Sequence, residues 1–532
     1  MKNVRRQFRL PCLGSYRRCL ALAVAGLLLA FRGAAQVATP LPQPQAAQER
    51  PGATTLTELR HRIGTLISDR KFASAQWGVK IVESESGTVV FEHNAGQLFS
   101  PASNSKLYTV ALGLDRLGVD YRIRTSLYAS ARPNPDGVLE GDLIVYGRGD
   151  PTINGRLNGG DLLRAMRPLV SALTNAGVRQ VNGNLIGDTS FIRGPEFGSG
   201  WSWDDQFYYY GAEISALTVN DNLVSCTVLP GAAEGAPCEV AFDPPTRLTT
   251  VHNRSRTVAR DGARSIRLIR LPSRNELYIT GELPREGIPF RAEVTVHDPA
   301  ALFLELFASA LAAQGVSLAG TNRVVSWLDE DRRAVGSLVE LGYVESLPLR
   351  DIAREIQKPS QNLYTDLLLA HVGERSRTEE TPPDLTSEEL GIRELTRFLG
   401  AAGVPPGHVL FEEGSGLSRN NLTTPAATIA LLRHMNEHKA ADAYLQSLPV
   451  AGVDGTLRNR MNGTAAAGKV RAKTGTLRWA NSLSGYVTTA SGEKLLFALM
   501  LNRFHGAGGS RSARAELDAI AIELAAFSGR VR

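Results

Sequence analysis

The stretch Phe99-Ser-Pro-Ala-Ser-Asn-Ser-Lys106 is followed directly by an apolar run at helical spacing. Small residues and a proline stand where a helix would begin, so we expect Ser103 at the start of a helix. Lys106 then lies one turn later on the same face, where its amine can reach the Ser103 hydroxyl. A desolvated lysine near a helix N-terminus has a destabilised charged form and can take a proton from serine. The stretch therefore predicts a nucleophile beside its base, with a helix cap followed by a solvated lysine as the simpler alternative.

The same Ser-x-x-Lys spacing occurs twice more, and both copies have structural explanations. Ser68-x-x-Lys71 ends an amphipathic helix, and Ser491-x-x-Lys494 crosses a hairpin turn. Only the copy at Ser103 opens a helix. Its place in the expected structure, more than the motif itself, singles out Ser103.

Residues 1–35 are predicted to be an export signal. A basic leader precedes the apolar run 19–31, which is too short to span a bilayer comfortably, and Gly33-Ala34-Ala35 fits the small-residue rule for cleavage. An uncleaved anchor is the alternative. Residues 36–54, rich in Pro, Gln and Ala, follow as a flexible lead-in. We therefore expect an exported protein, with the periplasm as its location.

The formal net charge of +6 comes from that leader. Residues 1–35 hold seven Lys and Arg and no acid, so the rest of the chain carries a formal net charge of −1. A chain without net positive charge offers no electrostatic footprint for nucleic acid. Its length still allows two or three domains, each with a core, at about 150 residues per domain.

The two ends of the chain beyond the leader have similar patterns. Each combines an amphipathic helix with a β-hairpin, and further helices are expected before the last hairpin. We therefore expect one α+β domain in which both ends contribute to a single antiparallel sheet flanked by helices. The expected helices cover 55–68, 349–356, 363–371, 424–438 and 513–527, and the expected hairpins pair 76–82 with 88–92 and 481–489 with 494–502.

The middle of the chain, 118–340, changes to short alternating segments with many turns. This pattern predicts a β-rich insert, and one helix over 298–314 leads the chain back out. The expected division is a main domain from 55–117 and 341–532, interrupted by two nested domains, 118–211 with 295–340 and 212–294.

Two cysteines lie outside the leader, Cys226 and Cys238. In an oxidising compartment a disulfide between them would close a short loop, worth about 3 kcal/mol in the chain-entropy model. Two buried free thiols are the alternative. No metal site is predicted, because Met435 stands between His434 and His438 where a zinc protease carries its glutamate.

Two more motifs add polar groups to a cleft. Ser360-Gln-Asn362 lies just before a helix, where a hydroxyl and an amide can point into a cleft, with a plain helix cap as the alternative. Lys473-Thr474-Gly475-Thr476 occurs once, before the closing hairpin. It would place a cation and two hydroxyls along a strand, with a glycine that lets a substrate backbone lie close. An exposed lysine at the entry to a strand is the alternative.

In this order, Ser-x-x-Lys, Ser-x-Asn and Lys-Thr-Gly resemble the signature of penicillin-binding proteins and serine β-lactamases. The long gap between Lys106 and Ser360 resembles the class C low-molecular-mass group, the D-alanyl-D-alanine carboxypeptidases/endopeptidases of the penicillin-binding protein 4 type, peptidase family S13. The likeness covers about 55–527 and includes Tyr146-Gly-Arg-Gly-Asp-Pro-Thr152, Gly200-Trp-Ser-Trp203, Gly414-Ser-Gly-Leu-Ser-Arg419 and Leu448-Pro-Val-Ala-Gly-Val-Asp-Gly-Thr456.

The resemblance implies an acyl-enzyme mechanism that needs no cofactor. Ser103 would be the acylated nucleophile, Lys106 its activating base, and Ser360 the relay of a proton to the leaving D-alanine. Where this chain has Ser-Gln-Asn, the commoner family form is Ser-Asp-Asn, which changes only the residue between the two functional ones. The implied binding residues are Asn362 for the substrate amide, Lys473, Thr474, Gly475 and Thr476 for the terminal carboxylate, the backbone N–H groups of Ser103 and Thr476 for the oxyanion, and Arg419 and Asp188 for the charged groups of the stem peptide.

The implied partners are peptidoglycan stem peptides, with β-lactam antibiotics as inhibitors. A β-lactamase-like hydrolase is one alternative, disfavoured because no dedicated deacylation glutamate stands out and the large insert suits a polymer. A non-catalytic cell-wall binder of the same fold is another, disfavoured because a binder does not need the Lys106 amine. Peripheral membrane contact through the last helix, 513–527, is also open, although its acidic residues favour packing against the sheet. The sequence predicts no oligomeric state.

Overall fold

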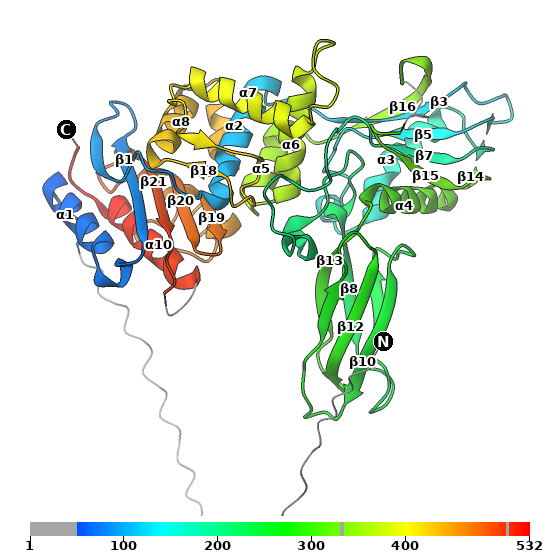
Figure 1. Cartoon of the computed structure of the whole chain (residues 1–532), viewed down its shortest axis with the longest axis horizontal. Helices are drawn as coiled ribbons and strands as arrows, with labels where there is room; N and C mark the ends of the chain where they lie inside the picture. The colour runs from blue at the N-terminus through cyan, green and yellow to red at the C-terminus, as the bar shows by residue number, and fades with distance from the viewer. Residues whose placement is uncertain (1–50, 330–334, 507–509, 532) are drawn as a thin grey trace, which may run out of the picture. The chain divides into compact units, whose positions relative to one another are not determined.

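The computed structural model describes residues 51–532, apart from 330–334, 507–509 and 532. The predicted export signal, 1–35, and nearly all of the lead-in, 36–54, lie outside the described residues, so both stay predictions. Within the described part of the chain, no helix is long and apolar enough to cross a membrane. Figure 1 labels the helices and strands.

One antiparallel sheet of five strands is built from both ends of the described chain (Figure 1). Its order is β19-β20-β21-β1-β2, so the first strand lies beside the last one, with register from Gln76↔Asn502 to Glu83↔Leu495. The predicted single sheet shared by the two ends is thereby confirmed. Its strands are β1 (Gln76–Glu83), β2 (Val89–His93), β19 (Val470–Leu477), β20 (Ala480–Thr488) and β21 (Lys494–Asn502).

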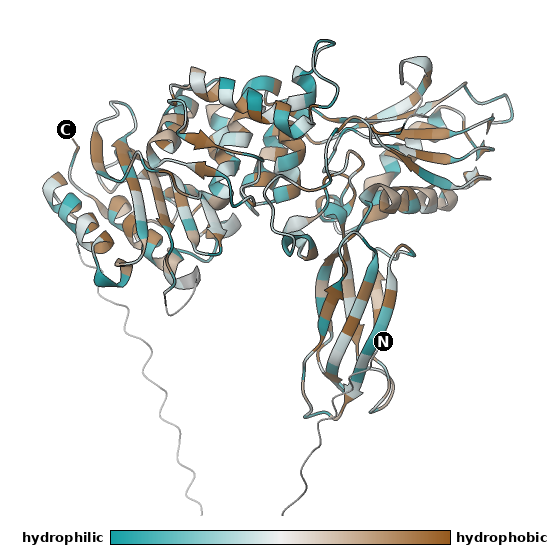
Figure 2. Ribbon diagram, viewed as in Figure 1, coloured by the Kyte–Doolittle hydropathy of each residue, from teal (hydrophilic) through white to brown (hydrophobic). Residues whose placement is uncertain are grey.

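Helices cover both faces of this sheet, which explains why β21 is apolar from Leu495 to Leu501. Leu495, Phe497 and Leu499 belong to the core on one face, whereas Leu496 and Ala498 belong to the core on the other. Figure 2 colours the ribbon of the whole chain by hydropathy, with apolar residues in brown. A strand buried on both faces loses the polar alternation of a half-exposed strand. The first face packs with α1 (Leu56–Ile67) and α10 (Ser510–Ala526), and the second with α2 (Ser105–Leu117), α5 (Leu349–Gln357), α6 (Asn362–Ser376), α7 (Ser387–Ala401), α8 (Pro425–Glu437) and α9 (Ala441–Ser447).

Helix α2 runs through the second core, and every residue from Ser105 to Leu114 is buried. Polar side chains on this helix therefore need partners inside the protein. Lys106 and Thr109 are among them, and their partners belong to the site described below. The five predicted helices of this domain are confirmed, whereas α7 and α9 have no counterpart among the sequence predictions.

The insert is organised around a mixed sheet of order β15-β7-β5-β3-β16. Helix α4 (Pro299–Ala313) is the predicted return helix, but α3 (Leu162–Asn175) was not predicted, and it contains Pro168. The strands are β3 (Arg124–Ala129), β5 (Leu143–Tyr146), β7 (Leu185–Asp188), β15 (Asn322–Val325) and β16 (Val339–Glu345), with a smaller parallel sheet of β4 (Val138–Leu139), β6 (Gln180–Val181) and β14 (Ser317–Leu318). Pairing of β16 with β3 continues to Glu345, past the expected boundary at residue 340, and the domain boundaries stay predictions.

Two three-stranded sheets form the remainder of the insert, in the order β13-β8-β9 and β10-β12-β11. Their apolar residues share one core with the mixed sheet, and β10 runs parallel to β12. The strands are β8 (Leu223–Leu229), β9 (Glu239–Asp243), β10 (Thr250–Val258), β11 (Arg267–Arg270), β12 (Glu276–Pro284) and β13 (Phe290–Thr295).

The considered disulfide between Cys226 and Cys238 is absent, since both residues are buried free thiols. Cys226 on β8 lies opposite Phe242 on β9, and Cys238 precedes β9. Cys238 comes four residues before Phe242, and four residues of extended chain span roughly 13 Å. A disulfide needs the two cysteine Cα atoms within about 7 Å, so the Cα atoms of Cys226 and Cys238 are too far apart. Burial also raises the pKa of Cys226 to about 11. The correct alternative is therefore the pair of buried thiols.

Candidate active site

Ser103 lies in the short 3-10 turn Ala102–Asn104 that leads into α2. The turn is held against the sheet, because Asn104 donates to the Lys473 carbonyl at 3.0 Å and Ser482 donates to the Pro101 carbonyl at 2.6 Å. Ala102, directly before Ser103, has φ of 48°, a backbone conformation that residues with a side chain rarely adopt. Such strain is typical of positions that a surrounding structure holds for function.

The Lys106 amine is completely buried beneath Ser103. It donates to Ser103 Oγ at 3.0 Å, to Asn362 Oδ1 at 2.6 Å and to the Ser415 carbonyl at 2.6 Å. Burial lowers the pKa of Lys106 to about 8, although the nearby carboxyl groups of Asp366 and Glu413 oppose this shift. A neutral amine beside a serine hydroxyl is therefore accessible near neutral pH.

A second buried amine, that of Lys473 on β19, contacts a second serine. It donates to Ser360 Oγ at 2.8 Å and to the Thr474 carbonyl at 2.9 Å. Burial and the positive charge of Lys106 hold the pKa of Lys473 well below its ordinary value. Ser360 has φ of 67° and is the second strained residue in the site.

Asn362 is the first residue of α6, and both ends of its amide are occupied. Its Oδ1 accepts from Lys106, and its Nδ2 donates to the Tyr210 carbonyl at 2.8 Å. This residue therefore joins the base on α2 to the insert.

Strand β19 lies at the edge of the sheet and presents polar groups to the site. Thr474 donates through Oγ1 to Thr456 Oγ1 at 2.8 Å. A Cβ on Gly475 would collide with Ser482 Oγ and with the Pro101 carbonyl. The glycine thus lets the Ser103 turn lie close to the strand, and the expectation that it also makes room for a substrate backbone stays a prediction.

The direction of the β19 backbone bears on the expected oxyanion donors. The Ala472 amide donates to the Pro449 carbonyl, outside the sheet. Backbone groups alternate in direction along an antiparallel edge strand, so the N–H groups of Thr474 and Thr476 also point away from β20. The Thr476 N–H therefore does not pair with β20, and its role as an oxyanion donor stays a prediction.

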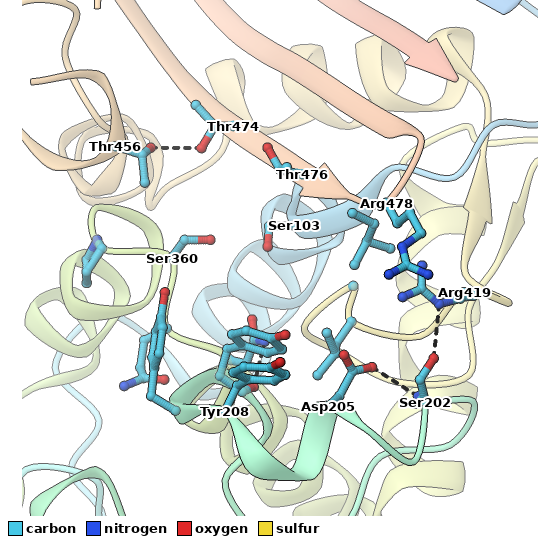
Figure 3. A pocket seen from close by; sticks show the side chains of 18 of the residues that line it. Ser103, Ser202, Asp205, Tyr208, Ser360, Arg419, Thr456, Thr474, Thr476 and Arg478 are labelled. Carbon is cyan, nitrogen blue, oxygen red and sulfur yellow. Dashed lines mark hydrogen bonds between the residues drawn. The ribbon is translucent and has the colours of Figure 1, made fainter. Parts of the chain in front are cut away.

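These groups border a cleft of about 1090 Å³ (Figure 3). Ser360, Thr474 and Thr456 lie to one side of Ser103, and Arg419 and Arg478 lie to the other. The insert closes the cleft with Asp205 and three consecutive tyrosines, Tyr208, Tyr209 and Tyr210.

Of the two residues predicted to bind charged groups of a peptide, Arg419 lines the cleft and Asp188 does not. Arg419 lines the cleft and donates to Ser202 Oγ at 3.0 Å. Asp188 does not line it, because it ends the buried strand β7 and its carboxylate accepts the Ser190 N–H at 2.9 Å. The expectation for Asp188 is therefore not supported. Three other acids line the cleft, Asp204, Asp205 and Asp221, and burial raises the pKa of Asp205 despite the opposing charge of Arg419.

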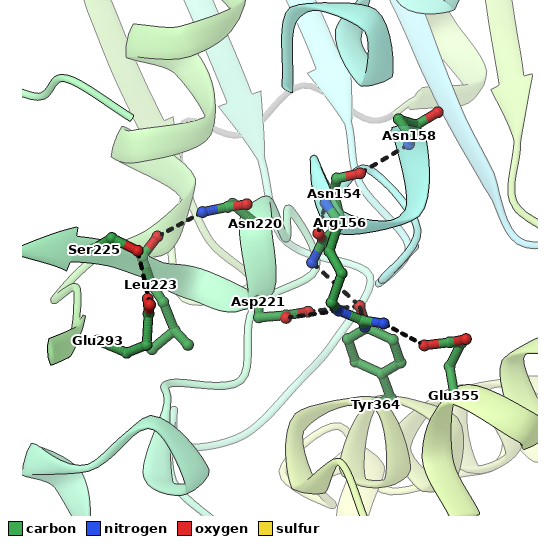
Figure 4. Close-up of polar contacts among 10 residues, drawn as sticks. All are labelled: Asn154, Arg156, Asn158, Asn220, Asp221, Leu223, Ser225, Glu293, Glu355 and Tyr364. Atoms are coloured by element: carbon green, nitrogen blue, oxygen red, sulfur yellow. Dashed lines mark hydrogen bonds and ion pairs between the residues drawn. The ribbon is translucent and has the colours of Figure 1, made fainter. Parts of the chain in front are cut away.

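The insert is fixed to helix α6 at the wall of the cleft (Figure 4). Tyr364 on α6 donates to Asp221 Oδ1 at 2.5 Å, and Arg156 bonds Glu355 Oε2 at 2.6 Å. Asn220, Asp221 and Asn222 all have positive φ values, so this loop is held in a strained shape. The contact lies two residues from Asn362 on the same helix.

Several residues of the site were missed in the sequence. Asp205 lies two residues after the quoted stretch Gly200-Trp-Ser-Trp203, and Asp366 follows Asn362 by one helical turn, so closeness to a predicted motif could have indicated both. His434 and His438 have other partners: His434 packs edge-on against Phe398, and His438 lies 3.1 Å from an aspartate, Asp115.

A profile of the D-Ala-D-Ala carboxypeptidase 3 (S13) family matches residues 59–524. The chain belongs to the S13 family. It is therefore a serine-type D-Ala-D-Ala carboxypeptidase, as the resemblance of its motifs implied. This membership also decides against the non-catalytic binder.

Curated relatives of this S13 chain agree with that result. It is 34% identical over 489 residues to a D-alanyl-D-alanine carboxypeptidase from Actinomadura sp. (strain R39), which covers 89% of this chain and 86% of the relative. It is 26% identical over 422 residues to the D-alanyl-D-alanine carboxypeptidase DacB from Haemophilus influenzae, which covers 78% of this chain and 83% of the relative.

Solved structures confirm the α+β fold of the S13 chain. The crystal structure of penicillin binding protein 4 from Haemophilus influenzae matches with a TM-score of 0.73 at 22% identity, covering 86% of this chain and 97% of that one. The same protein complexed with a novel β-lactam matches with a TM-score of 0.67 at 22% identity, covering 87% and 98%.

Proposed function

We propose that this S13 carboxypeptidase releases the terminal D-alanine of peptidoglycan stem peptides through an acyl-enzyme on Ser103. The observation that carries the proposal is the buried Lys106 amine, 3.0 Å from Ser103 Oγ at the edge of a cleft large enough for a peptide. A serine hydroxyl attacks a carbonyl only when a base removes its proton, and this amine is the base in contact with it.

Acylation begins as the Ser103 Oγ–H proton moves to the neutral Lys106 amine and Oγ bonds to the carbonyl carbon of the penultimate D-alanine. The carbonyl electron pair moves to oxygen, where the N–H groups of Ser103 and Thr476 stabilise the anion. Collapse restores the carbonyl and breaks the C–N bond. The leaving amine takes a proton from Ser360 Oγ, which regains one from Lys473 at 2.8 Å.

Deacylation reverses this proton flow with water as the nucleophile. The hydroxide part of water bonds to the ester carbon, and its remaining proton is taken up by Lys473. Lys106 returns the first proton to Ser103 Oγ as the ester bond breaks. Both lysines and the serine are then restored, so protons balance over one turnover.

Charged groups lie on both sides of Ser103, so the cleft favours a peptide that carries charged groups on both sides of the bond to be cleaved. Lys473 and Thr474 would bind the terminal carboxylate beside Ser360. Arg419 and Asp205, on the opposite side of Ser103, would bind the acidic and amino groups of the stem peptide. The Asn362 amide would meet the substrate amide by giving up its contact with the Tyr210 carbonyl.

Cleavage of D-alanyl cross-links is proposed for the same site. On the leaving-group side the cleft lining continues past Thr474 to Thr456 and Arg460. This extension gives space to a leaving group larger than one D-alanine. Export to the periplasm would bring the enzyme to such a polymer.

β-Lactam antibiotics are proposed as inhibitors that acylate Ser103. The Haemophilus influenzae relative is described in complex with one. Intact-protein mass spectrometry of the protein incubated with a penicillin tests this, followed by a time course on a stem peptide ending in D-Ala-D-Ala. A one-to-one adduct and release of D-alanine are expected.

The variants Ser103→Ala and Ser68→Ala make a matched pair, because each removes the serine of a Ser-x-x-Lys motif and Ser68 lies at the exposed end of α1. The first should lose both adduct and peptide cleavage, and the second should keep them. Rapid penicillin turnover without D-alanine release would favour the β-lactamase alternative. An adduct on Ser103→Ala would refute the assigned nucleophile.

A further inference from the structure

Two buried carboxyl groups lie behind Lys106, and the acylation steps above do not use them. Asp366 is on α6, and Glu413 is in the loop between the short strands β17 (Val409–Leu410) and β18 (Leu422–Thr423). Asp366 is 3% exposed and Glu413 is not exposed at all. Carboxyl groups are rarely so buried unless they have a specific partner.

Both carboxyl groups hold the peptide segment that accepts from Lys106. Ser415 N–H donates to Asp366 Oδ1 at 3.0 Å and to Glu413 Oε2 at 2.8 Å, and the Ser415 hydroxyl donates to Glu413 Oε2 at 2.5 Å. The carbonyl of the same Ser415 accepts from Lys106 at 2.6 Å. A shift of the segment around Ser415 would therefore move the Ser415 carbonyl, which accepts a hydrogen bond from the Lys106 amine.

Asp366 also belongs to the element that supplies the other acceptor. It follows Asn362 by four residues on α6, on the same face of the helix. Asn362 Oδ1 and the Ser415 carbonyl together fix two of the three hydrogen bonds of the Lys106 amine, and the third is to Ser103 Oγ. The amine is thereby aimed at the nucleophile.

The hydrogen bonds distinguish the charge states of the two carboxyls. Glu413 accepts from donors only: both groups of Ser415, two more backbone amides and the Asn421 side chain at 2.8 Å. That pattern fits an ionised carboxylate. Asp366 Oδ1 accepts two N–H groups, but Oδ2 has no hydrogen-bond partner among the described residues. This free oxygen is where a proton fits, and two neighbouring buried carboxyls do not both ionise.

We infer that Asp366 and Glu413 are positioning residues for acylation: Glu413 is the anion that stabilises the ammonium formed on Lys106, and Asp366 is a neutral carboxyl that holds the Ser415 segment. This inference rests on the proposed role of Lys106 as the base. Glu388 on α7 also faces Asp366, and the charge of Lys106 also acts on Lys473 on β19.

The test is the pH dependence of penicillin acylation of the full chain, followed by mass spectrometry, for Glu413→Gln, Asp366→Asn and Asp366→Ala. Removing the Glu413 charge destabilises the Lys106 ammonium, so the acidic limb of the rate profile should move to lower pH by about one unit or more. Asp366→Asn keeps a neutral group of the same shape, so that limb should stay in place. Asp366→Ala removes the acceptor of the Gly414 amide and one of the two acceptors of the Ser415 amide, so it should slow acylation by about 10²-fold at every pH.

Thr109→Val is the matched control, because Thr109 holds the Gly414 carbonyl of the same segment at 2.8 Å without a charge. It should lower thermal stability and leave the acidic limb in place. A downward shift in Asp366→Asn equal to that in Glu413→Gln would overturn the assignment of the proton. An unmoved limb in Glu413→Gln, or a rate in Asp366→Ala no lower than in Thr109→Val, would overturn the inference. Loss of the wild-type adduct would refute the proposed function instead.

Discussion

Lys106 and Lys473 form two sites with the same contact and different surroundings. Each amine is buried, and each donates to a serine hydroxyl, at 3.0 Å in Ser103 and 2.8 Å in Ser360. Two carboxyl groups lie near Lys106, whereas in the described part of the chain the Lys473 amine contacts no carboxylate. The comparison teaches that burial alone does not make a general base. Lys106 has a counter-ion within the protein, the proposed Glu413 carboxylate. Lys473 would receive its counter-ion from the substrate, as the terminal carboxylate of the peptide.

Replacing each lysine in turn separates the two sites most strongly. Lys106→Met removes the base and should slow penicillin acylation by about 10⁴-fold. Lys473→Met removes a binding and relay group and should cost about 10²-fold. Rates of adduct formation measured by mass spectrometry check both values. Equal losses would contradict the division of roles.

The distance between the two sites depends on Gly475. Gly475→Ala would push a Cβ into the Pro101 carbonyl and Ser482 Oγ, so the Ser103 turn must move away from β19. We expect acylation to fall by about 10²-fold and unfolding free energy by about 1–3 kcal/mol. Gly64→Ala on α1 is the control, since its Cβ would meet nothing within 4 Å. Thermal melts and acylation rates of both variants are the measurement.

Titration of Lys106 should dominate the pH profile of the unmodified enzyme. Because the neutral amine is the active form and its pKa is about 8, acylation should rise about tenfold per pH unit below pH 8 and level off above it. Stopped-flow acylation by a penicillin between pH 5 and pH 9.5, at constant ionic strength, tests this. A rate that falls across that range would show that Lys106 does not act as a neutral base.

The smallest expected effect concerns Lys473. The pKa of its amine lies well below the ordinary value in the free enzyme, and a bound carboxylate would raise it. Binding of a D-Ala-D-Ala peptide to Ser103→Ala should thus take up about one proton or less and tighten as pH falls. Calorimetry in buffers of different ionisation enthalpy measures the uptake. A peptide with an amidated C-terminus should cause no proton uptake. Equal uptake by both peptides would contradict the idea that the peptide carboxylate is the counter-ion of Lys473.

The parts of this site that depend on short-range spacing could be predicted from the sequence. Ser103 and Lys106 are one helical turn apart, so their contact follows from local geometry. Asp366 and Glu413 come together only because α6 packs beside a loop far away in the chain, and nothing in the sequence near either residue indicates that. Asp188 differs from these residues, because it lies outside the cleft lining and accepts the Ser190 N–H of its own turn, so its binding role stays a prediction without support from the cleft.

The fold divides in a similar way. The hairpins of the main sheet and most of the amphipathic helices around it have strong periodicity and were predicted, whereas α7 and α9 were missed. Helix α3 was missed because Pro168 interrupts its pattern, although a proline is tolerated once packing holds the helix. The parallel pairing of β10 with β12 could not be predicted, since strand order in a small sheet is set by contacts between distant segments.

The pairing of β1 with β21 has a consequence for the order of events during synthesis. Ser103 leaves the ribosome early, whereas β19, which carries Lys473, and β20 and β21, which join it to β1, are made after the insert and helices α5 to α9. Such distant pairing closes slowly, and the insert can fold first as a unit of its own. A partly made chain that lacks β19 therefore holds Ser103 without Lys473 and without Thr476, the proposed oxyanion donor. The proposed site is complete only after β19 and the strands that join it to β1 have been delivered.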